Sequence, residues 1–243
     1  MTPSDEIRDT RTLLEEKLKK PGAHSPETLL SLVRECIAHC RDCHPPHEIG
    51  PAVPGSGPAS ARLMIVGGTP SPEGVAEREP FVGSVRVLLE DNLRRTGLGL
   101  PDVYFTNAVK HCLQGISNGH ARPAGSEGCG GAEVHQAAVE ACRRLLHAEI
   151  AVVKPEVVLC LGEFAAEVVL GQDVDPEVSH QRLFHPGFVP TVLVTADPLR
   201  VLALTDESAK RCAEKEFLLD FHKVAEILGE FDPFRGREAL AQL

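Results

Sequence analysis

Three cysteines lie close together in the chain, at Cys36, Cys40 and Cys43. The Cys-x2-Cys spacing of Cys40 and Cys43 lets two thiolates on one turn bind the same metal ion or iron-sulfur cluster. Two thiolates supply half of such a site, so the other ligands must come from elsewhere in the chain. Free thiols packed in a core are the alternative interpretation of the same residues.

More candidate ligands lie in the long, glycine-rich segment Lys110–Glu133, which contains His111, Cys112, His120 and Cys129. Inside a compact domain, an irregular segment of this length is usually functional or disordered. The chain has eight cysteines, and its polar start lacks the apolar core of a signal peptide. We therefore expect a cytoplasmic protein with metal ligands or reduced thiols rather than disulfides.

A turn of small residues follows the first predicted strand. In the stretch Arg62–Gly83, an apolar run ends at Gly67 and Gly68 and continues into Thr69 and Pro70. Ligands of open α/β sheets bind at the carboxyl ends of strands, so this turn is predicted to form the floor of a pocket. A tight connection between two elements is the alternative.

Asn107 occupies a comparable position near the end of the next predicted strand, Asp102–Val109. A single asparagine amide offers a ligand edge both a hydrogen-bond donor and an acceptor. The side chain could equally serve as an ordinary turn residue.

Alternating strands and helices must position these residues. Apolar runs predict four strands: the run before Gly67, Asp102–Val109, Val157–Leu161 and Thr191–Thr195. Amphipathic patterns predict helices at Ser4–Lys20, Pro26–His39, Val85–Thr96, Glu133–Val153, Phe164–Leu170 and Asp206–Leu228. The expected fold is α/β, a three-layer α/β/α arrangement with a central, mainly parallel, four-stranded sheet. We divide the chain into an N-terminal helical extension (1–35), this domain (36–229) and a C-terminal tail (230–243).

The formal net charge of the 243-residue chain is −10. Affinity for phosphate backbones comes from clustered Lys and Arg, so this charge argues against a general polyanion-binding protein. No apolar run approaches the roughly 20 residues of a membrane span. No coiled coil or exposed apolar face is predicted either, so we expect a monomer without membrane contact.

Five short motifs follow one another along the chain: VGGTP, PFVG, VYFTNAVK, VVLCLG and VLVTADP. In this order they resemble the uracil-DNA glycosylase superfamily, most closely the iron-sulfur family 4 enzymes and their uracil-crosslinking relatives. The resemblance covers roughly Cys40–Leu228. It implies DNA, single-stranded or with a flipped base, as the partner and a 4Fe-4S cluster as the cofactor.

The resemblance also implies roles for two residues of the pocket. Phe81 matches the aromatic residue that stacks on the flipped base, and Asn107 matches the amide that reads the uracil edge. A base taken out of the duplex needs both an apolar face and hydrogen bonds along its edge. A core residue at the end of a loop is the alternative for Phe81.

Cluster ligands are implied in the same way. Cys40 and Cys43 match the first pair of cluster cysteines, and Cys142 matches the last. In family 4 the third cysteine directly follows the lysine of the strand-end motif, where this chain has His111 with Cys112 next to it. The implied set is Cys40, Cys43, Cys112 and Cys142, with His111 as the alternative to Cys112.

Two positions depart from the family. Family 4 carries a glutamate where this chain has Gly68, and a histidine where it has Asp197. Cleaving the bond between base and sugar develops positive charge on the sugar, which a carboxylate stabilises, and negative charge on the departing base, which a hydrogen-bond donor stabilises. Standard uracil excision is therefore expected to be weak or absent unless another group replaces them.

Three residues are candidate replacements, and His120 is a candidate for a separate, covalent role. Asp197 could act on the sugar side, although Ala-Asp-Pro also makes an ordinary turn and helix N-cap. Glu73 and Glu77 lie in the same loop as Gly68, with solvated carboxylates as the alternative. His120 lies in a loop similar to the one with which the crosslinking relatives capture the sugar covalently, and a neutral imidazole is a competent nucleophile. An exposed loop histidine is the alternative.

Three functions remain open on the sequence alone. The first is a base-excision enzyme that cleaves the N-glycosidic bond of uracil or a related base with non-standard catalytic groups. The second is a hydrolysis-deficient protein that binds or covalently traps uracil-containing or damaged DNA. The third is an enzyme acting on a free nucleoside or another small heterocycle, because an acidic protein then meets no phosphate repulsion.

Overall fold

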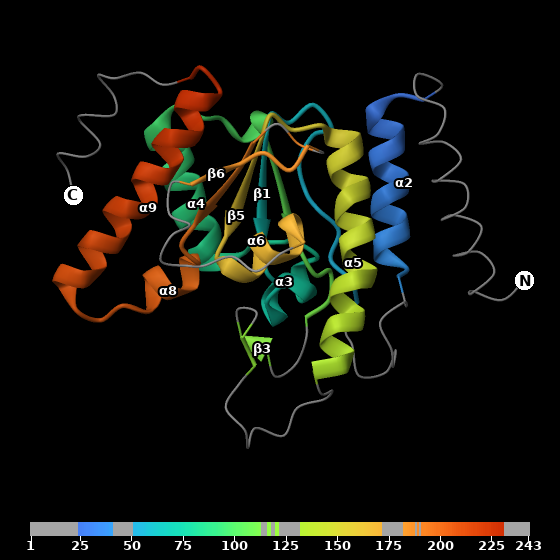
Figure 1. Ribbon diagram of the computed structural model, residues 1–243, viewed down its shortest axis with the longest axis horizontal. Helices are drawn as coiled ribbons and strands as arrows, with labels where there is room; N and C mark the ends of the chain where they lie inside the picture. The colour runs from blue at the N-terminus through green and yellow to red at the C-terminus, as the bar shows by residue number, and fades with distance from the viewer. Residues whose placement is uncertain are drawn as a thin grey trace, which may run out of the picture.

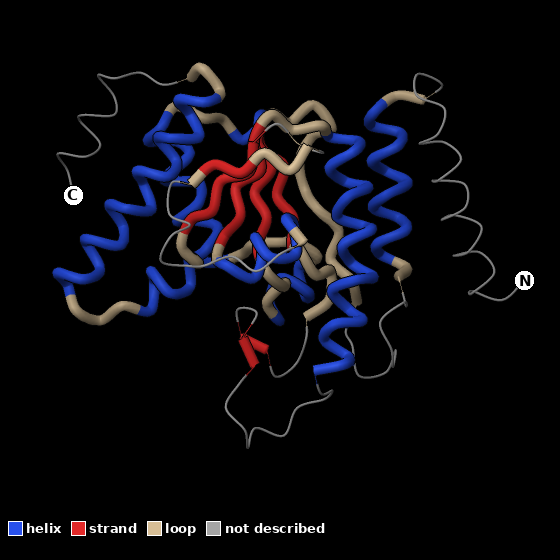
Figure 2. Tube along the Cα trace, in the orientation of Figure 1, coloured by secondary structure: helices blue, strands red, loops and turns tan. Residues whose placement is uncertain are grey.

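The computed structural model describes residues 24–40, 51–112, 116–117, 120–121, 132–171, 182–187, 189 and 191–230. At its centre lies a five-stranded sheet with the strand order β2-β1-β5-β7-β6 (Figures 1 and 2). The four parallel strands are β1 (Leu63–Gly67), β2 (Val103–Asn107), β5 (Val157–Leu161) and β7 (Thr191–Thr195). Every residue of these strands is buried, as expected for parallel strands that are covered on both faces.

Short antiparallel pairings lie at both edges of the sheet. At one edge, β6 (Leu183–Phe184) pairs antiparallel with β7. At the other, Ser56 forms an isolated antiparallel bridge with Phe105 of β2. The predicted α/β class is confirmed, but the predicted count of four strands was one too low. The missed strand is β6, whose two residues are too few to show a recognisable alternation of apolar and polar side chains.

Helices cover both faces of the sheet, so the expected three layers are present (Figures 1 and 2). The alternate residues Met64 and Val66 of β1 face one buried core, which also contains residues of α2 (Pro26–Ala38), α5 (Ala132–Val153) and α6 (Glu163–Leu170). Leu63 and Ile65 face the other core, together with residues of α4 (Gly83–Thr96) and α9 (Glu207–Ile227).

Two short helices begin at the carboxyl end of the sheet, where the sequence predicted a loop and a turn. Ser71 caps α3 (Pro72–Glu77) by accepting a hydrogen bond from Gly74 N at 3.0 Å. Asp197 caps α8 (Pro198–Ala203) by accepting one from Leu199 N at 2.8 Å. In both, the proline after the cap has the fixed φ that suits a first helical position. The remaining short elements are the 3-10 helix η1 (Leu100–Asp102) and a hairpin of β3 (Ile116–Ser117) and β4 (His120–Ala121).

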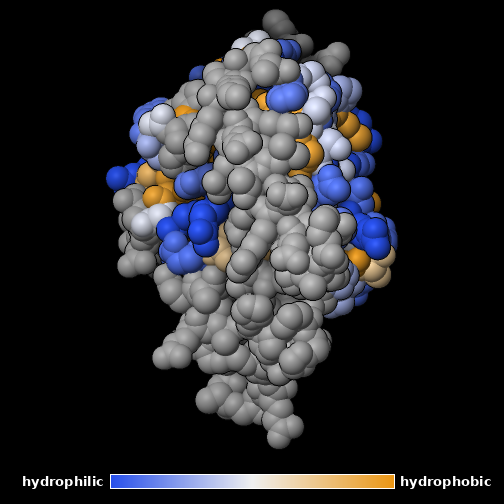
Figure 3. Space-filling view, turned by 90° about the vertical axis from the view of Figure 1, so that its right-hand side faces the viewer, coloured by the Kyte–Doolittle hydropathy of each residue, from blue (hydrophilic) through white to orange (hydrophobic). Residues whose placement is uncertain are grey.

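Parts of the predicted organisation lie outside the described residues, among them the predicted helix Ser4–Lys20 and residues 231–243 of the tail. The predicted division of the chain into residues 1–35, 36–229 and 230–243 stays a prediction. Helix α2 crosses the boundary at residue 35 and packs beside α5 (Figure 1). Among the described helices, none is long and apolar enough to span a membrane. Where described residues are visible in Figure 3, hydrophilic side chains surround scattered hydrophobic ones.

Candidate functional site

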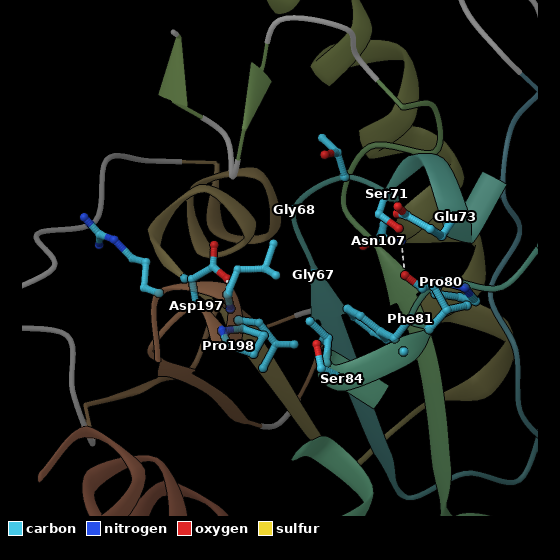
Figure 4. Close-up of a pocket in the computed structure, with 18 of the residues that line it drawn as sticks. Gly67, Gly68, Ser71, Glu73, Pro80, Phe81, Ser84, Asn107, Asp197 and Pro198 are labelled. Carbon is cyan, nitrogen blue, oxygen red and sulfur yellow. Dashed lines mark hydrogen bonds between the residues drawn. The ribbon is translucent and has the colours of Figure 1, made fainter. Parts of the chain in front are cut away.

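A cavity of about 370 Å³ opens at the carboxyl ends of the parallel strands (Figure 4). Residues from four chain segments line it, and each segment lies at the carboxyl end of one of these strands: 67–85 at β1, Asn107 at β2, 161–164 at β5 and 197–200 at β7. Because the strands are parallel, their carboxyl ends meet at the same edge and bring together residues that are far apart in the sequence.

Asn107 supplies the most deeply buried polar group of the cavity. Its side chain is 1% exposed, and its Nδ2 donates to Pro80 O at 3.1 Å (Figure 4). Its Oδ1 has no hydrogen-bond partner among the described residues. An unsatisfied buried acceptor costs about 1–3 kcal/mol, and a ligand that donates a hydrogen bond removes this cost. The side chain is therefore prepared to bind a ligand N–H or O–H.

Phe81 lies beside Asn107 and packs edge-on against Phe105, with ring centroids 6.0 Å apart and an interplanar angle of 75°. The close approach of these side chains requires the glycine of β1. A Cβ at Gly67 would lie 2.6 Å from Asn107 Oδ1 and 2.7 Å from Phe81 Cε1, nearer than real Cβ contacts come. Gly67, Phe81 and Asn107 thus form one packed unit.

Gly68 has a different neighbour. A Cβ at this position would lie 3.1 Å from Cδ1 of Phe164, the second residue of α6, which also lines the cavity. A larger side chain at position 68 would therefore require Phe164 to move. The space next to Gly68 is occupied by an aromatic ring, where the resemblance implies a glutamate.

Asp197 lies on the opposite wall of the cavity, next to Pro198 on the left-hand side of Figure 4, whereas Glu73 lies on the same side as Asn107. Asp197 lines the cavity while it caps α8. Glu163, the first residue of α6, has a side chain that is 17% exposed and forms an ion pair with Arg200 at 3.1 Å. Glu73 and Glu77 of α3 line the cavity from exposed positions.

A fully buried ion pair supports the floor of the site. Lys110 Nζ lies 2.5 Å from Glu149 Oε2, and both side chains are 0% exposed. Nζ also donates to the Asn107 carbonyl oxygen at 2.7 Å and to Thr106 Oγ1 at 2.6 Å. Glu149 in turn accepts hydrogen bonds from Thr106 Oγ1 and the Tyr104 hydroxyl, both at 2.9 Å, and from the backbone N–H of residue 55 at 3.0 Å. Burial and the charge of Glu149 raise the pKa of Tyr104, so its hydroxyl remains a donor.

The candidate cluster ligands come from segments that meet on the α2 and α5 side. Cys40, just after α2, and Cys142 of α5 belong to the same buried core. Cys142 Sγ accepts a hydrogen bond from Lys110 N at 3.4 Å, so the segment after β2 lies against α5. His111 is buried at 2% exposure, whereas Cys112 is half-buried. Burial and the nearby charge of Glu73 raise the pKa of Cys112.

Other predicted residues are separated from these groups or lie outside the described part. Pro70 is buried and does not line the cavity, whereas its neighbour Thr69 does. His120 pairs with Ser117 in the hairpin, but its side chain lies outside the described residues, as does all of Cys43. Among the described residues, no three His, Cys, Asp or Glu side chains are close enough together to hold a single metal ion.

Sequence reasoning missed Glu163 and Phe164. Both come directly after the VVLCLG motif, which contains β5, and this strand lies between β1 and β7 in the sheet. One signal was available. The ends of β1 and β7, the two neighbours of β5, had already supplied candidate residues, so residues at the end of β5 were to be expected in the same pocket.

Comparison with known proteins agrees with the motif order. Residues 54–221 match the protein family described as the uracil DNA glycosylase superfamily. The chain is 30% identical over 210 residues to a type-4 uracil-DNA glycosylase of Archaeoglobus fulgidus, a match that covers 85% of this chain and 96% of the relative. It is 28% identical over 207 residues to a type-4 uracil-DNA glycosylase of Thermotoga maritima, with 79% and 99% covered.

A third relative, a type-4 uracil-DNA glycosylase of Pyrobaculum aerophilum, is 32% identical over 142 residues, which are 58% of this chain and 64% of the relative. The family match spans all four segments that line the cavity. The resemblance predicted from the five motifs is confirmed, and the chain belongs to the uracil-DNA glycosylase superfamily.

Proposed function

We propose that this protein acts on DNA as a base-excision enzyme, binding a flipped uracil or related base in the cavity and cleaving its N-glycosidic bond. The observation that carries the proposal is the unpartnered Oδ1 of Asn107, buried beside Phe81 at the edge of the sheet. An acceptor at this position suits a base whose ring nitrogen bears a hydrogen. Uracil N3 has such a hydrogen, whereas N3 of cytosine does not, so the acceptor suits the N3 position of uracil and not that of cytosine.

Phe81 would stack on the base, and the turn from Gly67 to Thr69 would lie against it as the floor of the cavity. Pro70 would act only by shaping that turn. Asp197 would stabilise the positive charge that develops on the sugar and orient the attacking water. Its position in the cavity and its fixation at the start of α8 support this role.

The presence of Cys40 and Cys142 in one buried core supports a 4Fe-4S cluster on the α2 and α5 side. We propose Cys40, Cys43 and Cys142 as three of its ligands, with the fourth ligand coming from His111 or Cys112. The deeper burial of His111 and the hydrogen bond from the adjacent Lys110 to Cys142 favour His111 over Cys112. The cluster would serve as a covalent link between α2, α5 and the segment after β2. Iron content and absorption spectra of His111→Ala and Cys112→Ser distinguish the two ligands.

Incubation with single-stranded DNA that contains one uracil, followed by alkali and a denaturing gel, tests the proposed reaction. Alkali-sensitive breaks at the uracil are the expected result. Asn107→Ala should lower the ratio of binding to uracil-containing DNA over binding to cytosine-containing DNA of the same sequence on the order of tenfold or more, since a lost base contact is worth about 1–3 kcal/mol. Asn92→Ala is the matched control, because Asn92 is equally buried but lies in α4 outside the cavity.

The replacement of the family's catalytic groups by Gly68 and Asp197 favours a second candidate, a protein that binds or traps the base without hydrolysis. A heat-stable protein–DNA band that disappears in His120→Ala would assign His120 as a covalent trap. Uracil-specific binding that produces neither alkali-sensitive breaks nor a heat-stable protein–DNA band would show that the protein binds the base without reacting with it. Binding of a free nucleoside, combined with no preference for uracil in DNA, would support the small-heterocycle alternative and contradict the proposed function.

A further inference from the structure

The cavity contains more hydrogen-bond acceptors than uracil can use. Four carboxylates line it, at Glu73, Glu77, Glu163 and Asp197, and Asn107 presents Oδ1 while its Nδ2 is occupied by Pro80 O. Uracil has two carbonyl acceptors and one N–H donor, and the hydroxyl groups of Thr69, Ser71 and Ser84 in the lining can donate to its two oxygens. The four carboxylates go beyond what uracil requires, so the polar lining has an excess of negative charge.

Charge points in the same direction. Among the described lining residues, Arg200 is the one formal cation, and it forms an ion pair with Glu163. The lining also contains two aromatic residues, Phe81 near Asn107 and Phe164 at the start of α6. Carboxylates together with aromatic faces are the groups with which proteins bind organic cations.

Resting on the proposed base-excision function, we propose that the base excised at this site is cationic: an N-alkylated purine in DNA, such as one methylated at N3 or N7. Its ring carries a formal positive charge, its amino group donates hydrogen bonds, and it can stack on Phe81. The unpartnered Oδ1 of Asn107 accepts one of those donors.

The replacement of histidine by Asp197 then has a chemical explanation. Water attacks C1′ of the sugar, the bond from C1′ to N9 breaks, and its electron pair moves to N9. For a cationic purine this electron pair cancels the positive charge, so the base leaves neutral and the lost water proton passes to solvent. Uracil would leave as an anion and needs a donor, which an ionised carboxylate does not provide. A carboxylate at position 197 therefore suits a base that is positively charged before the reaction.

Two DNA substrates of the same sequence test the proposal. One is methylated with radiolabelled dimethyl sulfate, and the other carries a single uracil. The full-length protein is incubated with each, and released bases are measured by chromatography against a protein-free sample, which gives spontaneous depurination. Methylated purines should be released on the order of tenfold or more faster than uracil. Asp197→Asn should lower their release on the order of 10²-fold while keeping the helix cap.

Asp206→Asn is the matched control, because Asp206 caps α9 in the same way but does not line the cavity. It should leave both rates unchanged, and Asp197→His should shift the preference toward uracil. Release of uracil without release of methylated purines would overturn this inference and leave the proposed function intact. Unchanged methylpurine release by Asp197→Asn would also overturn it. No release of either base would instead contradict the base-excision function itself.

Discussion

The absence of a side chain at Gly67 determines how closely Asn107 and Phe81 approach each other. The carboxamide oxygen and the aromatic ring both occupy the space that a Cβ would take. A substitution here would displace the acceptor and the stacking surface at once, without touching Asp197 on the opposite wall. In the proposed reaction, separate residues of the cavity would therefore carry the recognition of the base and its chemistry.

Gly67→Ala should weaken binding of the target base in DNA on the order of tenfold or more, at a stability cost of about 1–3 kcal/mol from overpacking. Titration of labelled single-stranded DNA and urea unfolding measure the two effects. Gly99→Ala is the control, because a Cβ there meets nothing nearer than Pro101 Cδ at 3.4 Å. Equal DNA affinity of the Gly67 variant and the wild type would show that Asn107 and Phe81 do not need this close approach.

Several of these residues could be predicted from the sequence, since Gly67, Phe81 and Asn107 lie in motifs that end strands. Asp197 was predicted with two alternative roles, and the structure combines its position in the cavity with the helix cap. The packing of Phe164 against Gly68 could not be predicted, because it depends on the distance between two strand ends rather than on either motif.

Strand β2 and helix α5 are joined by the buried pair of Lys110 and Glu149. Every hydrogen of the Lys110 ammonium has an acceptor, and one of these acceptors is the carbonyl of Asn107. Removing one partner of such a pair leaves an uncompensated buried charge, whereas removing both can be nearly neutral. The pair therefore connects the stability of two elements to the position of Asn107.

Lys110→Met and Glu149→Gln should each lower the free energy of unfolding by about 3–5 kcal/mol, and the double variant should be more stable than either single variant. Urea unfolding of the four proteins measures the cycle. The exposed pair Arg94 and Asp91 is the control, where the corresponding substitutions should cost about 1 kcal/mol or less. Additive losses at Lys110 and Glu149 would contradict a coupled pair.

The packing of α9 against α4 makes stability depend on pH. Burial and the nearby charge of Arg95 lower the pKa of His222 below its ordinary value of 6.5. The unfolded chain therefore takes up a proton at this histidine before the folded protein does. This contribution to stability is present above pH 6.5 and is lost as the pH falls through the lower pKa of the folded state.

His222→Gln should reduce the loss of stability between about pH 7 and about pH 5, because glutamine does not titrate in this range. Urea unfolding at several pH values measures the slope. An unaltered slope in the His222 variant would assign the acid sensitivity to other groups.

The whole molecule follows the alternation of strands and helices that the sequence predicts, because long buried strands and amphipathic helices carry strong periodicity. Val157–Leu161 and Thr191–Thr195 were predicted with the bounds that the structure gives them. Among the described elements that escaped prediction are α3, α8 and β6, which have two to six residues. Their formation depends on a capping side chain or on a neighbouring strand, so local periodicity contains too little information to find them.

Loss of the proposed cluster should affect the whole molecule, because its ligands come from α2, α5 and the segment after β2. Cys142→Ser should lower the iron content per chain and the melting temperature together, whereas exposed Cys212→Ser should change neither. Iron analysis and thermal unfolding measure the two quantities. Full iron content in Cys142→Ser would remove this residue from the ligand set.

The pairings at the two edges of the sheet have a consequence for contacts between copies of the chain. Edge strands with free N–H and C=O groups serve as templates on which a second molecule can add a strand. Here Ser56 engages one edge strand and β6 covers part of the other, so docking of a foreign strand would first require these short pairings to be displaced. These short edge pairings thereby hinder the ordered aggregation to which an open parallel sheet is prone.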